Sequence, residues 1–141
     1  MPPYAPFVSR SVPKGRVLVV DNDKDHLGLL KLELERAGFE VETLSGPIGV
    51  SYRIRVTRPA FVLIDLSLPA IRGDKLLRIA RLAADTETRF YYYSAADEDT
   101  LRALSARDGV SYIRKSGSTV AVAQQLSIAS TEAVRESPRL G

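Results

Sequence analysis

The sequence predicts an α/β fold in which a doubly wound, five-stranded parallel sheet is flanked by five helices. Two observations predict it: short apolar runs, many of them β-branched, recur along the chain, and each is followed by a segment with apolar residues at helical spacing. Alternation of this kind implies parallel strands, helices on both faces and right-handed crossovers. A chain of 141 residues is long enough for one such domain.

The elements alternate strictly from residue 16 onward. The predicted strands are the apolar runs at 16–20, 39–44, 61–65, 89–93 and 109–114. The predicted helices are the segments at 24–37, 46–57, 74–84, 97–106 and 120–134. Gly38 is suited to end the first helix, and a hydroxyl within 116–119 can cap the last. The segment 46–57 is rich in β-branched residues, but a helix is expected there because parallel strands need a crossover connection.

Composition narrows the class of protein. We expect an extended, proline-rich arm at 1–14, one domain at 15–136 and a flexible tail at 137–141. No apolar run approaches the ~20 residues of a membrane helix, and no signal peptide is recognisable. The absence of cysteine excludes disulfides and thiolate metal sites, which fits a cytoplasmic protein. The net charge of +3 comes from dispersed residues without a recognition motif, so no nucleic-acid partner is expected.

Polar side chains stand where the predicted strands end. They are Asp21, Asn22 and Asp23 after the first strand, Asp65 at the end of the third, Ser94 after the fourth and Lys115 after the fifth. In an open parallel sheet, ligands bind just outside the carboxyl ends of the strands. These ends therefore bring carboxylates, a hydroxyl and an ammonium to one small volume, which suits binding a divalent cation and receiving a phosphoryl group.

Asp65 is the expected nucleophile, because a carboxylate can attack phosphorus and form an acyl phosphate. Magnesium, or manganese in its place, can neutralise the transferring group, held by carboxylates of Asp21 and Asp65 and the backbone carbonyl of Ser67. Lys115 can meet a phosphoryl oxygen as a point charge, and Ser94 can donate a hydrogen bond to another. Each residue alone is commonplace, since aspartate at a strand end is often a turn or cap residue. Their joint order at successive strand ends supports the functional interpretation.

Four segments resemble the motifs of response-regulator receiver domains. They are 17–23, 61–69 with the following Gly73, 93–95 and 112–115, and the resemblance extends over about 15–136. It implies a flavodoxin-like fold with strand order 2-1-3-4-5 and a role in two-component signalling. It also implies a sensor histidine kinase or phosphotransfer protein as phosphoryl donor, and an unnamed downstream protein as target.

The same resemblance assigns roles to individual residues. It makes Asp65 the phosphoacceptor and gives the metal ligands as Asp21, Asn22, Asp65 and the Ser67 carbonyl, with Asp23 as a further candidate. The phosphoryl-binding and switch residues are Ser94, Ala95, Lys115 and Tyr112. The face formed by the fourth helix, fifth strand and fifth helix is expected to bind the downstream protein. A homodimer through the same face is a further possibility.

The chain departs from the receiver pattern at three places. Asn22 stands where the family usually has a second acid, so weaker metal binding is expected. Lys115 is followed by Ser116-Gly117 instead of proline, which permits a looser turn. The fourth strand contains Tyr91-Tyr92-Tyr93, whose hydroxyls either reach the rim of the sheet or alter the switch. His26 is expected to be an exposed helix residue with no catalytic role.

Three functions remain open on these grounds. The leading one is a stand-alone receiver, which is a phosphoacceptor and not an enzyme. The second is a degenerate receiver that works as a phosphorylation-independent interaction module, suggested by Asn22 and the missing proline. The third is a haloacid-dehalogenase-like phosphatase with Asp21 as nucleophile and Asp23 as acid/base. It is disfavoured because it leaves the motif at 65–69 unexplained.

Overall fold

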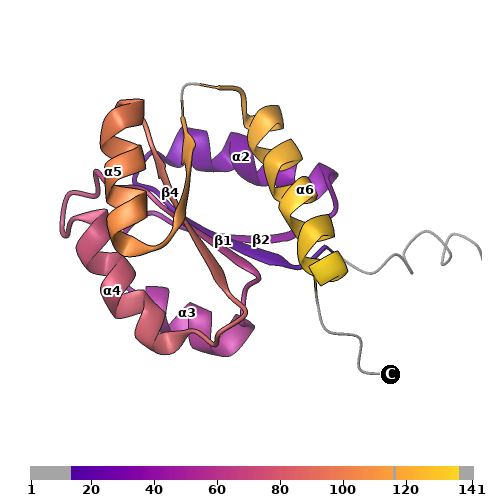
Figure 1. The fold of residues 1–141 in the computed structure, drawn as a ribbon, viewed down its shortest axis with the longest axis horizontal. Helices are drawn as coiled ribbons and strands as arrows, with labels where there is room; N and C mark the ends of the chain where they lie inside the picture. Colours follow the sequence, from indigo (N-terminus) through magenta and orange to yellow (C-terminus); the bar gives the residue numbers. More distant parts are fainter. Residues whose placement is uncertain (1–13, 116, 137–141) are drawn as a thin grey trace, which may run out of the picture.

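The computed structural model describes residues 14–115 and 117–136, with side chains described as far as Glu132. The expected arm at 1–14, apart from Lys14, and the expected tail at 137–141 lie outside the described residues. Within these described ranges, ten elements alternate between strand and helix (Figure 1). The strands are β1 (Arg16–Val20), β2 (Glu40–Leu44), β3 (Phe61–Ile64), β4 (Arg89–Ser94) and β5 (Ser111–Arg114). The helices are α2 (Lys24–Arg36), α3 (Val50–Thr57), α4 (Gly73–Ala83), α5 (Glu98–Asp108) and α6 (Thr119–Glu136).

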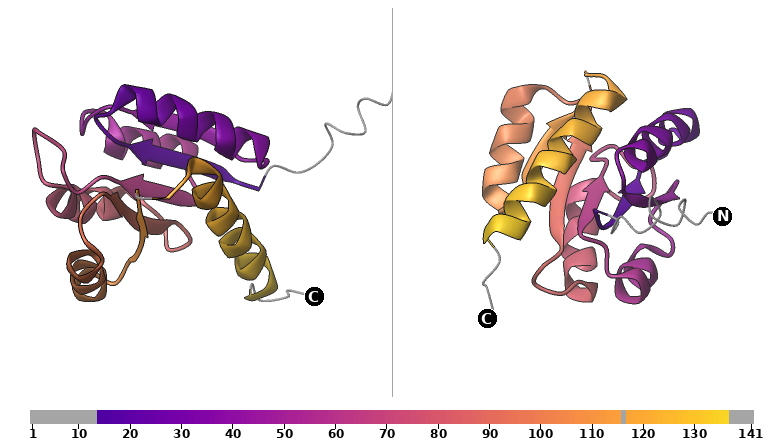
Figure 2. Two further views of the ribbon diagram at one scale, coloured as in Figure 1. Left: turned by 90° about the horizontal axis from the view of Figure 1, so that it is seen from above. Right: turned by 90° about the vertical axis from the view of Figure 1, so that its right-hand side faces the viewer.

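All strand pairs in the sheet are parallel, and the strand order is β2-β1-β3-β4-β5. The predicted doubly wound architecture is therefore confirmed. The helices α2 and α6 pack on one face, and α3, α4 and α5 cover the other (Figure 1). Two views from other sides show α2 running alongside β1, as a crossover helix does (Figure 2).

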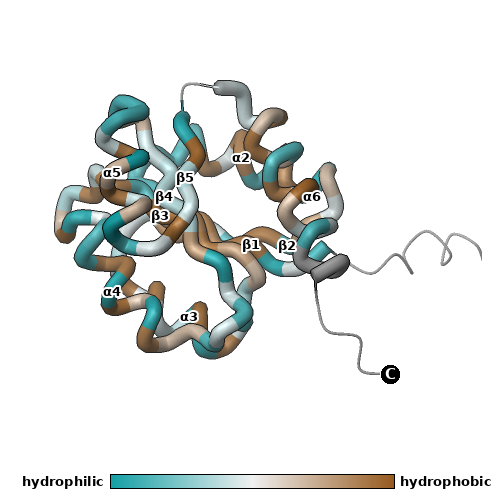
Figure 3. The backbone as a smooth tube through the Cα atoms, in the orientation of Figure 1, coloured by the Kyte–Doolittle hydropathy of each residue, from teal (hydrophilic) through white to brown (hydrophobic). Residues whose placement is uncertain are grey.

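The strands separate two hydrophobic cores because successive side chains point to opposite faces of a sheet. Val17 and Val19 of β1 pack toward α2 and α6, whereas Leu18 and Val20 pack toward the other three helices. The hydrophobic residues of β1 and β3 lie together at the centre of the molecule (Figure 3). Because both faces are covered, β3 and residues 17–20 of β1 are apolar and buried at every position, as parallel strands usually are.

Local signals explain most helix ends. Asp23 caps α2 by accepting a hydrogen bond from the backbone N–H of His26 at 3.1 Å, and Gly38 follows the helix with a φ of 105°. Ser118 caps α6 by accepting from the N–H of Ala121 at 3.1 Å, as expected for 116–119. The helix expected at 46–57 begins only at Val50, because the preceding residues form a turn that ends at Gly49 with a φ of 90°.

None of the helices in the described ranges combines the length and the apolar character needed to cross a membrane.

Candidate functional site

The backbone fixes three polar residues one position beyond the ends of β1, β3 and β5. The N–H of Asp21 donates to the carbonyl of Leu44, and the N–H of Asp65 donates to that of Val20, both at 3.0 Å. The N–H of Lys115 donates to the carbonyl of Ser94 at 2.9 Å. These bonds continue the hydrogen-bond ladder of the sheet, so the sheet fixes the backbone positions from which these three side chains extend.

The side chains of these three residues meet. Lys115 Nζ lies 2.5 Å from Asp21 Oδ2 and 3.2 Å from Asp65 Oδ2. The other oxygen of each carboxylate accepts a backbone N–H at 3.0 Å, from Asp23 for Asp21 and from Ser67 for Asp65. Both aspartates are buried, with exposed fractions of 0% and 3%. The result is an oriented pair of carboxylates that share one ammonium.

Gly73 permits the loop after β3 to close tightly over Asp65. A Cβ at this position would lie 2.2 Å from the backbone oxygen of Asp65 and 2.7 Å from the Cα of Leu66. Such distances are far below van der Waals contact, so any larger residue would displace the backbone that holds Asp65. This explains, in physical terms, why a glycine follows the motif at 65–69.

The remaining candidate residues lie around this centre in different ways. Ser94 is buried, and its Oγ accepts the N–H of Ala96 at 3.2 Å, while Ala95 is exposed. Asn22, Asp23 and Ser67 are exposed, and the Asp23 carboxylate is used to cap α2. Tyr112 is half-buried on β5 and donates its hydroxyl to Glu98 of α5 at 2.7 Å, which raises the pKa of the phenol.

The acidic pair fits a magnesium ion that retains water ligands. Asp21 Oδ2 is buried and receives no hydrogen bond from the described residues, although the Lys115 ammonium lies close to it. No cluster of three or more acidic or histidine side chains suited to a metal occurs among the described residues. Two carboxylates are nevertheless enough, because protein-bound magnesium usually takes one or two, with phosphate oxygens and water completing six ligands. Asp21 and Asp65 would hold the ion. The side-chain amide of Asn22, directly after Asp21 in the sequence, would be the group that takes the place of a third carboxylate.

Two aromatic side chains beside the centre were not expected there from the sequence. The Tyr93 hydroxyl is hydrogen-bonded to Nε2 of His26, and the two rings stack with centroids 5.4 Å apart. Burial, together with the negative charges of Asp21 and Asp65, raises the pKa of Tyr93 well above its usual value. The expectation that His26 is an exposed residue is wrong, because its ring is half-buried against Tyr93. The only feature of the sequence that could have indicated an aromatic side chain beside the site is the tyrosine directly before Ser94.

The neighbouring Tyr92 also has a partner for its hydroxyl. It is fully buried on the opposite face of the sheet and donates to Asp108 at 2.5 Å. The two buried tyrosines of β4, Tyr92 and Tyr93, therefore satisfy their hydroxyls with side chains of α5 and α2, and this explains how both fit a central strand.

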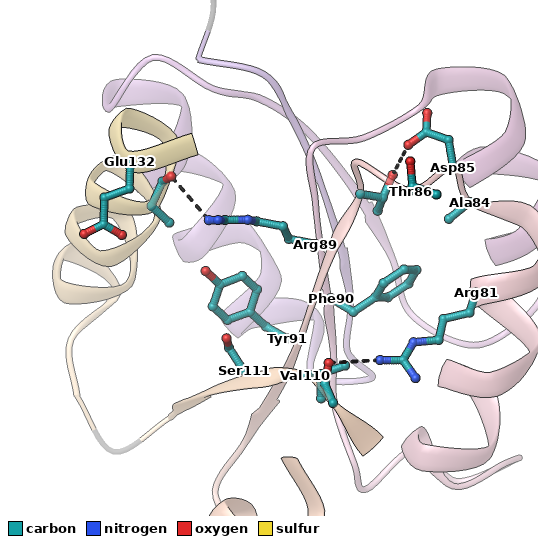
Figure 4. A pocket seen from close by; sticks show the side chains of 13 residues that line it. Arg81, Ala84, Asp85, Thr86, Arg89, Phe90, Tyr91, Val110, Ser111 and Glu132 are labelled. Atoms are coloured by element: carbon teal, nitrogen blue, oxygen red, sulfur yellow. Dashed lines mark hydrogen bonds between the residues drawn. The ribbon is translucent and has the colours of Figure 1, made fainter. Parts of the chain in front are cut away.

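A hollow of about 820 Å³ lies at the opposite end of the sheet, where β4 and β5 begin (Figure 4). Two arginines that line the hollow donate hydrogen bonds to backbone carbonyls of the protein. Arg81 donates to the carbonyl of Gly109 at 3.2 Å, and Arg89 donates to the carbonyl of Ala129 at 3.3 Å. The first bond connects α4 to the end of α5, and the second connects β4 to α6, so both arginines serve contacts within the protein.

Comparison with known proteins identifies relatives for most of the chain. The family model described as response regulator receiver domain matches residues 17–127. The DNA-binding response regulator MtrA of Mycobacterium tuberculosis is 33% identical over 66 residues, which is 47% of this chain and 29% of MtrA. The transcriptional regulatory protein PrrA of Mycobacterium leprae is 35% identical over 66 residues, or 28% of its length. The chain thus matches less than a third of these curated relatives.

Solved structures share the fold. A CheY-like receiver domain protein from Methanospirillum hungatei superposes with a TM-score of 0.75 at 24% identity, covering 86% of this chain and 97% of that one. The BeF3-activated N-terminal receiver domain of RstA from Klebsiella pneumoniae gives a TM-score of 0.71 at 22% identity, with coverage of 82% and 97%. At these identities the similarity shows the fold alone.

Proposed function

The chain belongs to the response regulator receiver domain family, and on that premise we propose that Asp65 accepts a phosphoryl group from a histidine kinase or phosphotransfer protein. The observation that carries the proposal is the contact of one ammonium, that of Lys115, with the buried carboxylates of both Asp21 and Asp65. An isolated cap or turn aspartate needs no such arrangement. A phosphoryl acceptor needs a fixed carboxylate, a cation-binding neighbour and a positive charge for the transferred oxygens.

Transfer requires Asp65 to attack phosphorus through one carboxylate oxygen. A P–O bond to Asp65 forms while the P–N bond to the donor histidine breaks, and the released imidazole nitrogen keeps the electron pair and takes up a proton. The hydrogen bond from the Ser67 N–H orients the Asp65 carboxylate. The Lys115 ammonium moves from carboxylate oxygen to phosphoryl oxygen, which stabilises the added negative charge. Asp21 and Asp65 would hold a magnesium ion, which would supply further neutralisation of the phosphoryl oxygens.

The phosphoryl group then acts on the face formed by α5, β5 and α6. Ser94 Oγ leaves the N–H of Ala96 for a phosphoryl oxygen, and Tyr112 leaves Glu98 for the space that Ser94 vacates. A groove of about 380 Å³ lies on this face, and Glu98 and Tyr112 line it. We place the downstream protein there, or a second copy of the chain, so that the output is a protein contact and not catalytic turnover.

One observation favours a second function, that of a phosphorylation-independent interaction module. Lys115 contacts both carboxylates at once, and Asn22 contributes no charge, so the acidic pair is already partly neutralised without a cation. In that case the receiver fold and its output face persist, but Asp65 is not modified.

Intact-mass measurement separates the two functions. The purified protein is incubated with magnesium and a small phosphodonor such as acetyl phosphate. A gain of one phosphoryl mass is expected, lost on chelating magnesium and lost in Asp65→Asn. Asp85→Asn, which changes an exposed carboxylate at the far end of the sheet, serves as the matched control and should gain the mass normally. Absence of any mass gain in the folded wild-type protein would favour the interaction module instead.

A further inference from the structure

Tyr93 occupies the space between His26 and Lys115. The Lys115 Nζ lies over its ring, 5.3 Å from the centroid, on the side where that ammonium also contacts Asp21 and Asp65. The hydroxyl of the same ring is hydrogen-bonded to His26 of α2, and only 1% of Tyr93 is exposed. One aromatic ring therefore touches the cation of the site and is itself held from a separate helix.

The ring restricts an otherwise flexible side chain. Lysine carries its charge on a four-carbon stem with many rotamers, and a Gly at position 117 follows soon after Lys115. The face of an aromatic ring attracts an ammonium, more strongly where water is excluded. The Lys115 side chain is only 16% exposed, so this attraction acts in a largely dry environment.

We propose that Tyr93 is a positioning residue that holds the Lys115 ammonium between Asp21 and Asp65, and that His26 fixes the ring in place. For catalysis this inference rests on the proposed phosphoryl transfer, because the held ammonium is the group that meets the phosphoryl oxygens. The placement of Lys115 is a separate physical claim, which can be measured whether or not Asp65 is phosphorylated.

The placement is tested by NMR of the Lys115 ε-methylene group. Protons above an aromatic ring resonate upfield, so the wild-type signal is expected well upfield of the other lysines. Tyr93→Leu should return it to the ordinary position, whereas Tyr93→Phe and His26→Ala keep a ring that is less well held and should give intermediate shifts. Tyr92→Phe is the matched control, because it removes a buried tyrosine hydroxyl bond on the opposite face of the sheet and should leave the signal unchanged.

The function is tested by the rate of Asp65 phosphorylation from acetyl phosphate at saturating magnesium. Tyr93→Leu should slow it about fivefold to tenfold, the effect expected for a desolvated cation–ring contact. The same substitution in a Lys115→Ala background should produce no further loss, because Tyr93 acts through Lys115. If Tyr93 had a purely structural role, Tyr93→Leu would instead slow phosphorylation equally in the wild-type and Lys115→Ala backgrounds.

Two results overturn the proposal: an unchanged Lys115 signal in Tyr93→Leu, or equal losses of rate with and without Lys115. If Tyr93→Leu fails to fold, Tyr93→Phe and His26→Ala decide by the same measurements, since a wild-type signal in both removes the role of His26. Failure of the wild-type protein to become phosphorylated refutes the proposed function, while the NMR signal still decides where the ammonium is held.

Discussion

Asn22 leaves the site with one negative charge fewer than usual. It follows the buried Asp21 at the position where receiver domains usually have a second acid. The described acidic pair, Asp21 and Asp65, carries two negative charges, and Lys115 already offsets one of them. A divalent cation entering such a site gains less electrostatic energy than at three carboxylates. We therefore expect this site to need a higher magnesium concentration to be filled.

Asn22→Asp should therefore tighten magnesium binding by about tenfold, equivalent to about 1.4 kcal/mol. The affinity is measured by titrating magnesium and following the NMR signals of residues near Asp21. Gln124→Glu adds the same charge on the exposed surface of α6 and should leave the affinity unchanged. Equal affinities in Asn22→Asp and wild type would show that residue 22 does not face the cation.

At the level of single residues, the sequence predicted which side chains gather but not what surrounds them. Asp21 and Asp65 come together because they follow the neighbouring strands β1 and β3, and the long side chain of Lys115 reaches them from the end of β5, on the far side of β4. Their chemical roles stay predictions. The contact between His26 and Tyr93 was not predictable, because it joins residues 67 positions apart through side chains alone. Alternation along β4 says which face Tyr93 occupies, not which residue its hydroxyl meets.

Helices α4 and α5 are joined by a charged network next to the loop that follows β3. Asp74, one residue after Gly73, is buried and pairs with Arg72 at 3.1 Å and with Arg107 at 3.0 Å. Burial alone would raise the pKa of Asp74, but the Arg107 hydrogen bond and the charge of Arg72 hold it below the usual value. The network thus fixes the start of α4, and with it the loop over Asp65, to the end of α5.

The same arginine binds a second acid. Arg107 also pairs with Asp108 at 2.8 Å, and its hydrogen bond, with help from Tyr92, lowers the pKa of Asp108 to about 2. A carboxyl whose pKa is lowered by folding stabilises the folded state above its unfolded pKa. This contribution is lost as the pH falls from the ordinary value of 3.8 toward about 2.

Arg107→Gln should lower the free energy of unfolding at neutral pH, because it leaves the buried Asp74 with fewer donors. It should also flatten the loss of stability between pH 3.8 and about 2, since Asp108 then titrates nearer its unfolded pKa. Urea unfolding over this pH range measures both effects. Arg102→Gln, which breaks exposed pairs on the same helix, is the control and should leave the free energy of unfolding almost unchanged.

Element boundaries follow the sequence where a cap or a glycine is present and deviate elsewhere. The helix start at Val50 deviates because the residues before it form a turn, which the β-branched composition did not reveal. Not every apolar side chain of α4 is buried, since Ile79 and Leu82 are 46% and 87% exposed. Only Leu76, Leu77 and Ala80 of α4 face the sheet, because a short surface helix buries one narrow stripe.

On the scale of the whole molecule, the alternation of strands and helices was enough to predict the layers. A continuous apolar run such as 61–64 fits only a strand covered on both faces, and the crossovers then require parallel pairing. The order of the strands was predicted from the resemblance to receiver domains and is confirmed. Periodicity alone does not specify which strand neighbours which, because each crossover can turn toward either edge of the sheet.

The whole chain also offers the most direct test, which is to find where a phosphoryl group arrives. The protein is treated with magnesium and acetyl phosphate, reduced with borohydride to convert any aspartyl phosphate into homoserine, and mapped by peptide mass. Of the 17 aspartates and glutamates in the chain, we predict modification of Asp65 alone, and none when magnesium is chelated. Modification of Asp21 or of another acid, or an unmodified Asp65 in the folded protein, would contradict this account.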